Sequence, residues 1–430
     1  MPADPRVRSV SFLSPGWPPG RVPNGITTYV GNMRPGLERL GVASTVLTTE
    51  MLGEPDPAAV LLGGARRPRA RRAVLRVLRK LGGGRSRGLE LGWGVAEAIQ
   101  GLGEPRRPEL VELEESFGGA YYAQPIIPVP VVVRVHGPWF LNGTALGLPE
   151  DAMFRWRDRE EGRCFAAADG VTAPSRDVLE RVRAHHGLAL ARAVVIPNPV
   201  PSVPLERRWR LEACDGRTIL FVGRFDRHKG GDLVIDAFRA IAGALPHARL
   251  VFVGPDRGLQ SSDGGSRTLP SYLEENLSPA VRERVEVTGA LPADRIEGLR
   301  RCAFVTVVAS RYENFPLALA EALAYGCPTI AARSGGIPEI LTDERTGMLF
   351  DAGDAGGLAA RIVAMFGSRE RAAELGRAAA ADVTGRLSPD AIARATLDYY
   401  GEVVARGRPS RLDEARRAPW RALYAATGLV

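Results

Sequence analysis

The sequence predicts an α/β protein made of two doubly wound, Rossmann-like domains. The chain has 430 residues, which is more than one ordinary hydrophobic core accommodates. In each half, short apolar runs typical of buried parallel strands alternate with helical patterns, and Gly-rich turns separate them. The polar, Pro-bearing stretch 200–216 is the expected linker. We therefore predict domains over 1–199 and 200–388, followed by C-terminal helices in 389–430.

The first half opens in the order strand, Gly-rich loop, helix and strand. Residues 7–13 alternate as a strand does, residues 26–40 follow a helical pattern, and residues 42–48 form the next expected strand. The loop between 14 and 25 is rich in Pro and Gly. Gly25, at the start of the helix, would let backbone amides approach a phosphate or acceptor group closely, although the turn alone could require this glycine.

The later strands of the first half are expected at 109–115, 129–135, 170–173 and 194–196, with a helix over 150–168 and Ser175 as a helix cap. His136 follows directly after one of these strands, and Gly137 follows it. In open α/β sheets, ligands bind at the carboxyl ends of the strands. This position favours a ligand-binding role for His136 over a purely structural one.

The second half begins with an apolar strand at 217–223, followed by a short loop that carries Arg224 and Lys229. Two cations at the carboxyl end of a strand could bind a pyrophosphate, Arg through its planar fork and Lys as a point charge. The alternative is an ordinary solvated loop. Asp232 is expected to cap the next helix. The loop does not satisfy the P-loop pattern, so the sequence does not support ATP hydrolysis.

The remaining strands of this half are expected at 250–254, 285–288, 303–309 and 328–332. The loop 257–268 contains Asp263-Gly264-Gly265 and is expected to move, as a cover over a nucleotide would.

A helix is predicted to begin at Pro316, where no backbone donor is needed. Glu321 is one carboxylate in an otherwise apolar helix, and helical spacing places it on a face with Leu317 and Ala324. A buried carboxylate is costly unless it accepts hydrogen bonds, for example from hydroxyl groups. Glu313 lies eight positions earlier, in the loop before the helix, whose N-terminus attracts anions. Carboxylates can accept hydrogen bonds from hydroxyl groups, and a helix N-terminus can bind phosphate. Side by side, they would suit a sugar joined to a phosphate.

Four motifs occur together in one order: His136-Gly137, Gly223-Arg224 with Lys229-Gly230, Glu313-x7-Glu321, and Gly335-Gly336-Ile337-Pro338-Glu339. In this order the chain resembles the retaining nucleotide-sugar glycosyltransferases of the GT-B fold, glycosyltransferase family 4 (glycosyl transferases group 1). The resemblance implies two Rossmann-like domains that face each other across a cleft. It also implies that a final helix packs back on the N-terminal domain.

The resemblance implies catalytic roles for His136 beside the transferred sugar, for Glu313 at the sugar hydroxyls, and for Arg224 and Lys229 at the diphosphate. It implies ribose contacts for Glu321. The complete donor-binding set is expected to be Gly25, Gly223, Arg224, Lys229, Leu291, Asn314, Phe315, Leu317, Ala318 and Glu321. Pro316 stands where many relatives carry glycine, so phosphate binding would depend on the amides of Leu317 and Ala318.

The activity that the resemblance implies is transfer of a sugar, with retained anomeric configuration, from a UDP- or GDP-sugar. The acceptor would be a hydroxyl of a glycan, of a lipid-linked molecule or of a small molecule, in bacterial surface polysaccharide or glycoconjugate synthesis. We expect no cofactor beyond the donor and no metal for its binding, since the chain lacks Asp-x-Asp. The alternatives are a nucleotide-sugar epimerase of the same fold and a non-catalytic, membrane-docked protein that binds nucleotide sugars.

The net charge of +8 is concentrated in part between residues 66 and 87, which contain ten basic residues and no acidic one. Apolar residues recur there at helical spacing, which predicts an amphipathic basic helix. Such a helix could contact an anionic membrane, or it could be an ordinary solvated surface helix. No aromatic residues interleave with the arginines, which disfavours nucleic acid.

Four scattered cysteines without Cys-x-x-Cys indicate a reducing compartment and argue against a zinc site. The N-terminus lacks a secretory pattern, and prolines interrupt the most apolar stretch, 125–135. We expect a cytoplasmic protein, peripheral on the inner face of the membrane if the basic segment binds there. His185 and His186 precede Gly187 and are expected only to complement the charge of a helix C-terminus.

Overall fold

A computed structural model of the chain describes residues 7–21, 24–63, 86–104, 106–260 and 265–407, together with Lys80 and Ala422. The predicted basic helix of residues 66–87 lies outside the described residues, apart from Lys80, Ser86 and Arg87. The chain divides into two compact units. Unit 1 comprises residues 1–140, 149–199 and 389–430, and unit 2 comprises residues 141–148 and 200–388.

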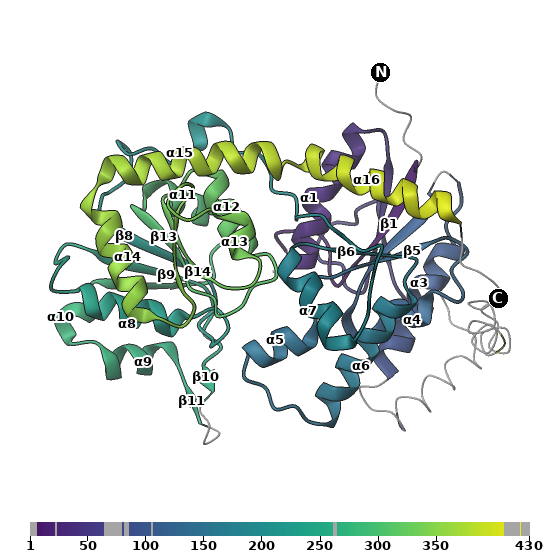
Figure 1. The fold of residues 1–430 in the computed structure, drawn as a ribbon, viewed down its shortest axis with the longest axis horizontal. Coiled ribbons are helices and arrows are strands. Elements are labelled where there is room, and N and C mark those ends of the chain that lie inside the picture. The colour runs from purple at the N-terminus through teal and green to yellow at the C-terminus, as the bar shows by residue number, and fades with distance from the viewer. Residues whose placement is uncertain are drawn as a thin grey trace. The chain divides into compact units, whose positions relative to one another are not determined.

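Unit 1 contains a seven-stranded sheet in the order β3-β2-β1-β4-β5-β6-β7, and every pairing in it is parallel (Figure 1). Its strands are β1 (Ser9–Ser14), β2 (Ala43–Thr48), β3 (Ala59–Leu61), β4 (Leu110–Glu114), β5 (Val131–Arg134), β6 (Gly170–Ala173) and β7 (Val194–Val195). The predicted strands of this half are all present. Strand β6 matches its predicted bounds, and the others differ by at most two residues at either end. The sequence analysis did not predict the short strand β3.

The described helices whose residues lie wholly in unit 1 are α1 (Gly25–Arg39), α3 (Arg87–Gln100), the 3₁₀ turn η2 (Ser116–Gly118), α4 (Gly119–Ala123), α6 (Ala152–Ala167), α7 (Arg176–His186) and α16 (Pro389–Arg406). Helix α5 (Trp139–Ala145) spans the boundary between the residue ranges of the two units. The Ser175 hydroxyl accepts a hydrogen bond from the amide of Val178, which confirms the predicted cap of α7.

Unit 2 contains a six-stranded parallel sheet in the order β12-β9-β8-β13-β14-β15. Its strands are β8 (Thr218–Val222), β9 (Arg249–Val253), β12 (Val285–Gly289), β13 (Val305–Val308), β14 (Thr329–Arg333) and β15 (Met348–Asp351). A separate antiparallel pair, β10 (Leu259–Gln260) and β11 (Ser266–Arg267), lies within the loop that was expected to cover a nucleotide. Two parallel Rossmann-like sheets confirm the predicted fold class.

The described helices of unit 2 are η3 (Leu205–Arg207), α8 (Gly231–Ile241), α9 (Leu269–Asn276), α10 (Pro279–Arg282), α11 (Ala293–Cys302), α12 (Leu317–Ala324), α13 (Ile337–Ile340), α14 (Ala355–Gly367) and α15 (Arg369–Arg386). Two predicted helix starts are wrong. Helix α8 begins at Gly231 with Gly230 as its cap, so Asp232 lies inside the first turn. Pro316 is the residue that caps α12 and not its first helical residue.

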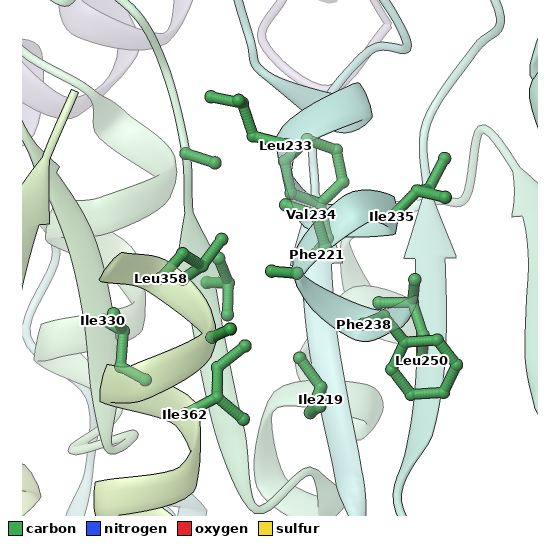
Figure 2. Close-up of a cluster of buried hydrophobic side chains, with 14 of the residues drawn as sticks. Ile219, Phe221, Leu233, Val234, Ile235, Phe238, Leu250, Ile330, Leu358 and Ile362 are labelled. Atoms are coloured by element: carbon green, nitrogen blue, oxygen red, sulfur yellow. The ribbon is translucent and has the colours of Figure 1, made fainter. Parts of the chain in front are cut away.

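The two faces of the unit 2 sheet are both covered, because successive side chains of each strand point to opposite faces. Ile219 and Phe221 of β8 pack in a buried cluster with residues of α8 and α14, and Figure 2 shows Leu233, Phe238, Leu358 and Ile362 around them. Leu220, between those two strand residues, packs with a second cluster that includes side chains of α11. Each such buried side chain contributes about 1.5–3 kcal/mol. The core therefore fixes the strand ends from which the loops described below emerge.

In unit 1, helix α16 packs against α1, although more than 300 residues separate them. Gly36 of α1 permits this contact, since a Cβ there would lie 2.3 Å from the carbonyl oxygen of Pro389. No helix among the described residues combines the length and the apolar composition needed to cross a bilayer.

Candidate functional site

The loops that follow β8, β13 and β14 meet in unit 2, because these three strands are neighbours in the sheet and run parallel. The His228 ring nitrogen Nε2 lies 2.7 Å from the carbonyl oxygen of Tyr312. The Arg311 amide donates to the carbonyl oxygen of His228 at 2.9 Å, and the Gly336 amide donates to that of Glu313 at 2.8 Å. Backbone contacts thus hold three segments of the predicted site together.

Lys229 and Glu313, 84 positions apart in the chain, form an ion pair at the meeting point of the first two loops. Lys229 Nζ lies 2.5 Å from Glu313 Oε1, and the Ser310 hydroxyl donates to the same oxygen at 2.7 Å. Burial raises the pKa of Glu313, but the charges of Lys229 and His228 and the two hydrogen bonds outweigh it, so its pKa is lowered. The structure therefore brings two predicted catalytic residues into direct contact, and Glu313 is ionised.

Arg224 lies on the same loop, with its side chain 42% exposed. Its Nε donates to Asp226 Oδ2 at 2.7 Å, while the other oxygen of Asp226 accepts from the amide of Lys229 at 2.8 Å. Asp226 therefore shapes the loop that presents both cations. The sequence analysis did not identify this acid, although its position between the two cations was visible.

Asp232, which was expected to cap α8, instead pairs with Arg311. The two guanidinium nitrogens of Arg311 donate to its two carboxylate oxygens at 2.9 and 2.6 Å. Such a bidentate pair is stronger and more directional than a single contact. It joins the first turn of α8 to the loop after β13, next to the Lys229–Glu313 pair.

Two glycines allow these loops to approach each other. Gly230 has φ +70°, and a Cβ there would lie 2.1 Å from the carbonyl oxygen of Ala309. Gly335 has φ +51°, and a Cβ there would lie 2.1 Å from the carbonyl oxygen of Glu313. Glycine is the residue that adopts a positive φ without strain and leaves room for such contacts. The loops could not meet in this way with larger residues at these positions.

At the N-terminus of α12, two backbone amides donate no hydrogen bond within the described part of the chain. The amides of Leu319 and Ala320 both donate to the carbonyl oxygen of Pro316 at 3.1 Å. For the amides of Leu317 and Ala318, the described part of the chain offers no hydrogen-bond partner, and both residues are only half buried. Free amides at a helix N-terminus are suited to an anion. These are the two amides on which the sequence analysis placed phosphate binding.

Glu321 lies on the same half-buried face of α12 as Leu317 and Ala318, with its side chain 34% exposed. Ala324 was expected on this face, but it is 1% exposed and points into the core. Arg300 of α11, which is 5% exposed, donates to Glu321 Oε2 at 2.6 Å. The sequence analysis anticipated only hydroxyl donors for Glu321. The guanidinium partner was missed because it comes from another helix.

The remaining predicted donor residues of unit 2 follow strands β8, β12 and β13. Asn314 and Phe315 are buried in the loop between Glu313 and α12. Gly223 follows β8, where a Cβ would lie 2.8 Å from the ring of Phe221. Leu291 follows β12 and packs, half buried, with side chains of α11.

His136 and Gly25 belong to unit 1. His136 follows β5, and its ring contacts the ring of Tyr29 edge to face, with 5.0 Å between the centroids. Burial, together with the charge of Arg134, lowers the pKa of His136 well below its usual value, so the imidazole is neutral at pH 7. Gly25 is exposed, and a Cβ there would meet nothing within 4 Å. The protein's own packing therefore does not require glycine at position 25.

Two buried carboxylates that the sequence analysis did not select hold the segment from His136 to Trp139. The Glu115 carboxylate accepts from the amides of His136 at 3.0 Å and Gly137 at 2.6 Å, and Glu161 accepts from the amide of Trp139 at 2.6 Å. Burial raises the pKa of Glu115 to about 7 and that of Glu161 to about 8. These contacts involve backbone groups, which leave no trace in side-chain spacing.

One cluster among the described residues offers the ligand atoms that a metal ion requires. It consists of Asp158, His185 and His186 in unit 1. None of the predicted donor residues belongs to it.

Comparison with known proteins gives the following matches. A family model described as "Glycosyl transferases group 1" matches residues 205–382, and one described as "Glycosyltransferase Family 4" matches residues 23–202. A D-inositol 3-phosphate glycosyltransferase of Xylanimonas cellulosilytica is 31% identical over 296 residues, which cover 66% of this chain and 68% of that protein.

Among solved structures, sucrose-phosphate synthase from Thermosynechococcus elongatus has a TM-score of 0.68 at 21% identity, covering 93% of this chain and 100% of its own. A protein from Anabaena, solved in complex with UDP-glucose, has a TM-score of 0.63 at 17% identity, covering 92% of this chain and 99% of its own. At these identities, the solved structures show only that the fold is shared. The D-inositol 3-phosphate glycosyltransferase is similar enough in sequence to show the family.

Proposed function

The chain belongs to glycosyltransferase family 4, the glycosyl transferases of group 1, and from that premise we propose how its residues divide the work of sugar transfer. The protein is a retaining, nucleotide-sugar-dependent glycosyltransferase with the GT-B fold. The proposal assigns the donor diphosphate to Lys229, Arg224 and the amides of Leu317 and Ala318. Glu313 takes the hydroxyls of the transferred sugar, and Glu321 takes those of the ribose.

The observation that carries this proposal is the Lys229–Glu313 pair beside a helix N-terminus with two unused amides. A cation and free amides suit the β-phosphate, and an ionised carboxylate suits hydroxyl donors. When the donor binds, Lys229 exchanges one anionic partner for another. With the whole donor bound, the sugar hydroxyls would take the place of Lys229 at the Glu313 carboxylate, which limits the desolvation cost of the site.

In the proposed step, the bond between the anomeric carbon and the β-phosphate oxygen breaks. The acceptor hydroxyl oxygen forms its bond to the anomeric carbon on the same face, and its proton passes to the departing diphosphate. Lys229, Arg224 and the α12 amides stabilise the negative charge that develops on the leaving group, which is commonly the largest electrostatic contribution to such a reaction. We assign His136 to the transferred sugar, where a neutral imidazole can donate or accept a hydrogen bond.

We further propose that the donor is a UDP-sugar, because the Anabaena structure that shares the fold was solved with UDP-glucose. The acceptor is a hydroxyl of a glycan, of a lipid-linked molecule or of a small molecule. The curated relative is named for D-inositol 3-phosphate, so this compound is the first acceptor to assay. We propose that the enzyme acts in bacterial surface polysaccharide or glycoconjugate synthesis.

The test measures release of nucleoside diphosphate from a panel of UDP- and GDP-sugars, with D-inositol 3-phosphate and with cell-extracted acceptors. We expect Lys229→Ala and Glu313→Ala to lower turnover by about 100-fold or more. Arg239→Ala is the matched control, because this exposed cation of unit 2 lies on α8 and its partners among the described residues are Asp236 and Asn276, which are not predicted site residues. Proton NMR of the product should show the anomeric configuration of the donor. Wild-type rates in both site variants would refute the assignment.

The basic segment 66–87 is proposed to contact anionic lipid when the acceptor is lipid-linked. Sedimentation with anionic and with neutral vesicles tests this directly. We expect the wild type to bind the anionic vesicles. Replacing the arginines of 66–79 by glutamine should abolish this binding. Equal binding of wild type and variant would remove the membrane from the proposal.

A further inference from the structure

Three side chains of unit 1 bring potential metal ligands together where the end of α7 crosses α6. Asp158 comes from α6, and His185 and His186 are the last two residues of α7. One ligand atom of each lies within 4.8 Å of the other two. His185 Nε2 is 2.9 Å from Asp158 Oδ2, and His186 Nε2 is 3.8 Å from Asp158 Oδ1.

A charge complement at the end of α7 does not explain the environment of the His186 imidazole. Its side chain is 10% exposed, and its Nε2 is buried with no hydrogen-bond partner among the described residues. A buried polar nitrogen without a partner costs free energy. A ligand at this position would remove that cost.

The two rings are also held in place by apolar contacts. His185 stacks on Phe140, with 3.9 Å between centroids and an angle of 3° between the planes. Gly162 of α6 makes room for the other ring, since a Cβ there would lie 2.6 Å from His186 Nδ1. Both imidazoles therefore keep their Nε2 atoms near Asp158, and little side-chain ordering remains for a ligand to impose.

The distances fit a small tetrahedral ion. Zinc binds histidine nitrogen and carboxylate oxygen at roughly 2.0–2.2 Å, which separates neighbouring ligand atoms by about 3.4 Å. The observed separations from Asp158, 2.9 and 3.8 Å, lie on either side of that value. Each of these two separations differs from the tetrahedral spacing by about 0.5 Å. Imidazole nitrogens with one carboxylate suit zinc and neighbouring divalent ions of the first transition row.

We propose that Asp158, His185 and His186 form a binding site for a divalent ion of the zinc class, which fastens the C-terminal end of α7 to α6. Three protein ligands leave the fourth position to water. The site contains no residue of the proposed donor machinery and does not depend on the proposed function. The argument against zinc from the cysteines does not apply to this site, because this ligand set needs no thiolate.

The first experiment is a calorimetric titration of untagged, chelator-treated, full-length protein with Zn²⁺ alone. We expect one ion per chain, and we expect His186→Ala and Asp158→Asn each to weaken binding by at least about tenfold. His247→Ala is the matched control, because His247 is exposed and lies in unit 2. This control should bind Zn²⁺ as the wild type does.

Co²⁺ serves as a spectroscopic probe of the same site. The wild type and His247→Ala should show the visible absorption of a tetrahedral cobalt centre, and His186→Ala should lose it. Thermal unfolding of each variant without metal checks that it is folded. Should His186→Ala prove unfolded, Asp158→Asn decides the matter, since its amide can still pair with His185. Zinc affinity that is the same in the wild type and in the folded variants would overturn the proposal, as would binding in the wild type that His247→Ala removes.

Discussion

The ion pair of Lys229 with Glu313 should affect the donor and the product nucleotide differently in the proposed donor site. The carboxylate lies 2.5 Å from the ammonium group, and in the proposed donor site it would compete with a diphosphate for this cation. Once a sugar is attached, its hydroxyl groups supply donors that the carboxylate can accept. UDP alone lacks those hydroxyls, so Glu313 would only repel it. The same residue is therefore expected to weaken binding of the product nucleotide and to support turnover of the donor.

Replacing Glu313 by Gln separates these two effects. We expect Glu313→Gln to bind UDP several-fold more tightly than the wild type, because Lys229 loses its anionic competitor. Turnover should fall by about 100-fold or more. Calorimetric titration with UDP and a steady-state assay measure the two quantities. Glu344→Gln is the control for loss of one acidic charge in unit 2, and it should change neither. Weaker binding of UDP to Glu313→Gln would show that Glu313 does not oppose the diphosphate.

Glu321 has a second role in the stability of unit 2. It is the only carboxylate that the described residues place on the buried guanidinium of Arg300, at 2.6 Å. Removing one partner leaves a buried charge unpaired, although the partial exposure of Glu321 limits the penalty. We expect Glu321→Ala to lower the free energy of unfolding by about 1–3 kcal/mol, and Glu321→Gln by less. Urea unfolding measures both. Equal stability of the alanine variant and the wild type would contradict this role.

At the residue scale, the sequence identified the types and positions of the main site residues but not their partners. The cations Arg224 and Lys229 were found from the strand end, and Glu313 and Glu321 from their spacing around a helix start. The partner Arg300 could not be found, because its guanidinium reaches Glu321 only through the packing of two helices. Pairing between distant residues depends on tertiary structure, which local patterns do not encode.

Among the elements, the segment after β5 is held by Glu115, a buried carboxylate with a raised pKa. Burial raises the pKa of Glu115 from its ordinary value of 4.5 to about 7. Between these two values, the folded state holds a proton that the unfolded state has released. The contribution of Glu115 to stability is therefore complete below pH 4.5 and is lost as the pH rises to about 7.

Replacing Glu115 by Gln should remove this contribution to the pH dependence. The wild-type stability should fall relative to that of Glu115→Gln as the pH rises from 4.5 to 7. The difference should reach at most about 3 kcal/mol, at roughly 1.4 kcal/mol per pKa unit. Urea unfolding at a series of pH values measures it. A stability difference between the two proteins that stays constant across this range would contradict the assignment.

The turn between β8 and α8 depends on Gly230. Gly230→Ala must either force a side chain into φ +70° or move the loop away from Ala309. We expect a loss of about 1–3 kcal/mol in stability and weaker binding of UDP, since the neighbouring Lys229 would shift. Gly298→Ala is the matched control, because it lies within α11, where a Cβ meets nothing within 4 Å. That variant should be as stable as the wild type or more stable, by up to about 1 kcal/mol.

Most elements could be predicted because their patterns are local. Strand patterns, caps such as Ser175, and the alternation of strands with helices all follow from short stretches of sequence. The errors have more than one cause. Asp232 did not cap α8 because Arg311, 79 positions away, offers it two charged hydrogen bonds. Ala324 was placed on the open face of α12 because helical spacing alone does not say how wide the buried face is.

At the scale of the whole molecule, the C-terminal helix α16 completes the core of unit 1. The Tyr400 hydroxyl of α16 donates to Glu112 Oε2 at 2.6 Å, and the Tyr29 hydroxyl of α1 donates to Glu112 Oε1 at 2.9 Å. All three side chains are buried, as is Arg134, which lies 4.3 Å from the centre of the Tyr29 ring. A buried acid on β4 thus ties the last described helix to the first.

Removing one hydroxyl tests this connection. Tyr400→Phe should lower the free energy of unfolding by about 1–3 kcal/mol, because it removes a buried hydrogen bond and leaves a carboxyl oxygen of Glu112 without that donor. Glu402→Gln is the control on the same helix, because its pair with Arg406 is exposed and should be worth less than about 1 kcal/mol. Thermal unfolding followed by circular dichroism measures both. A Tyr400→Phe variant as stable as Glu402→Gln would show that α16 does not depend on this contact.

The most direct test of the central assignment is a crystal structure of the protein with an intact UDP-sugar or with UDP. We predict β-phosphate oxygens at about 2.7–3.2 Å from Lys229 Nζ and from the amide nitrogens of Leu317 and Ala318, with the Lys229–Glu313 contact opened. A nucleotide bound elsewhere, with that contact unchanged and the two amides facing water, would contradict the account.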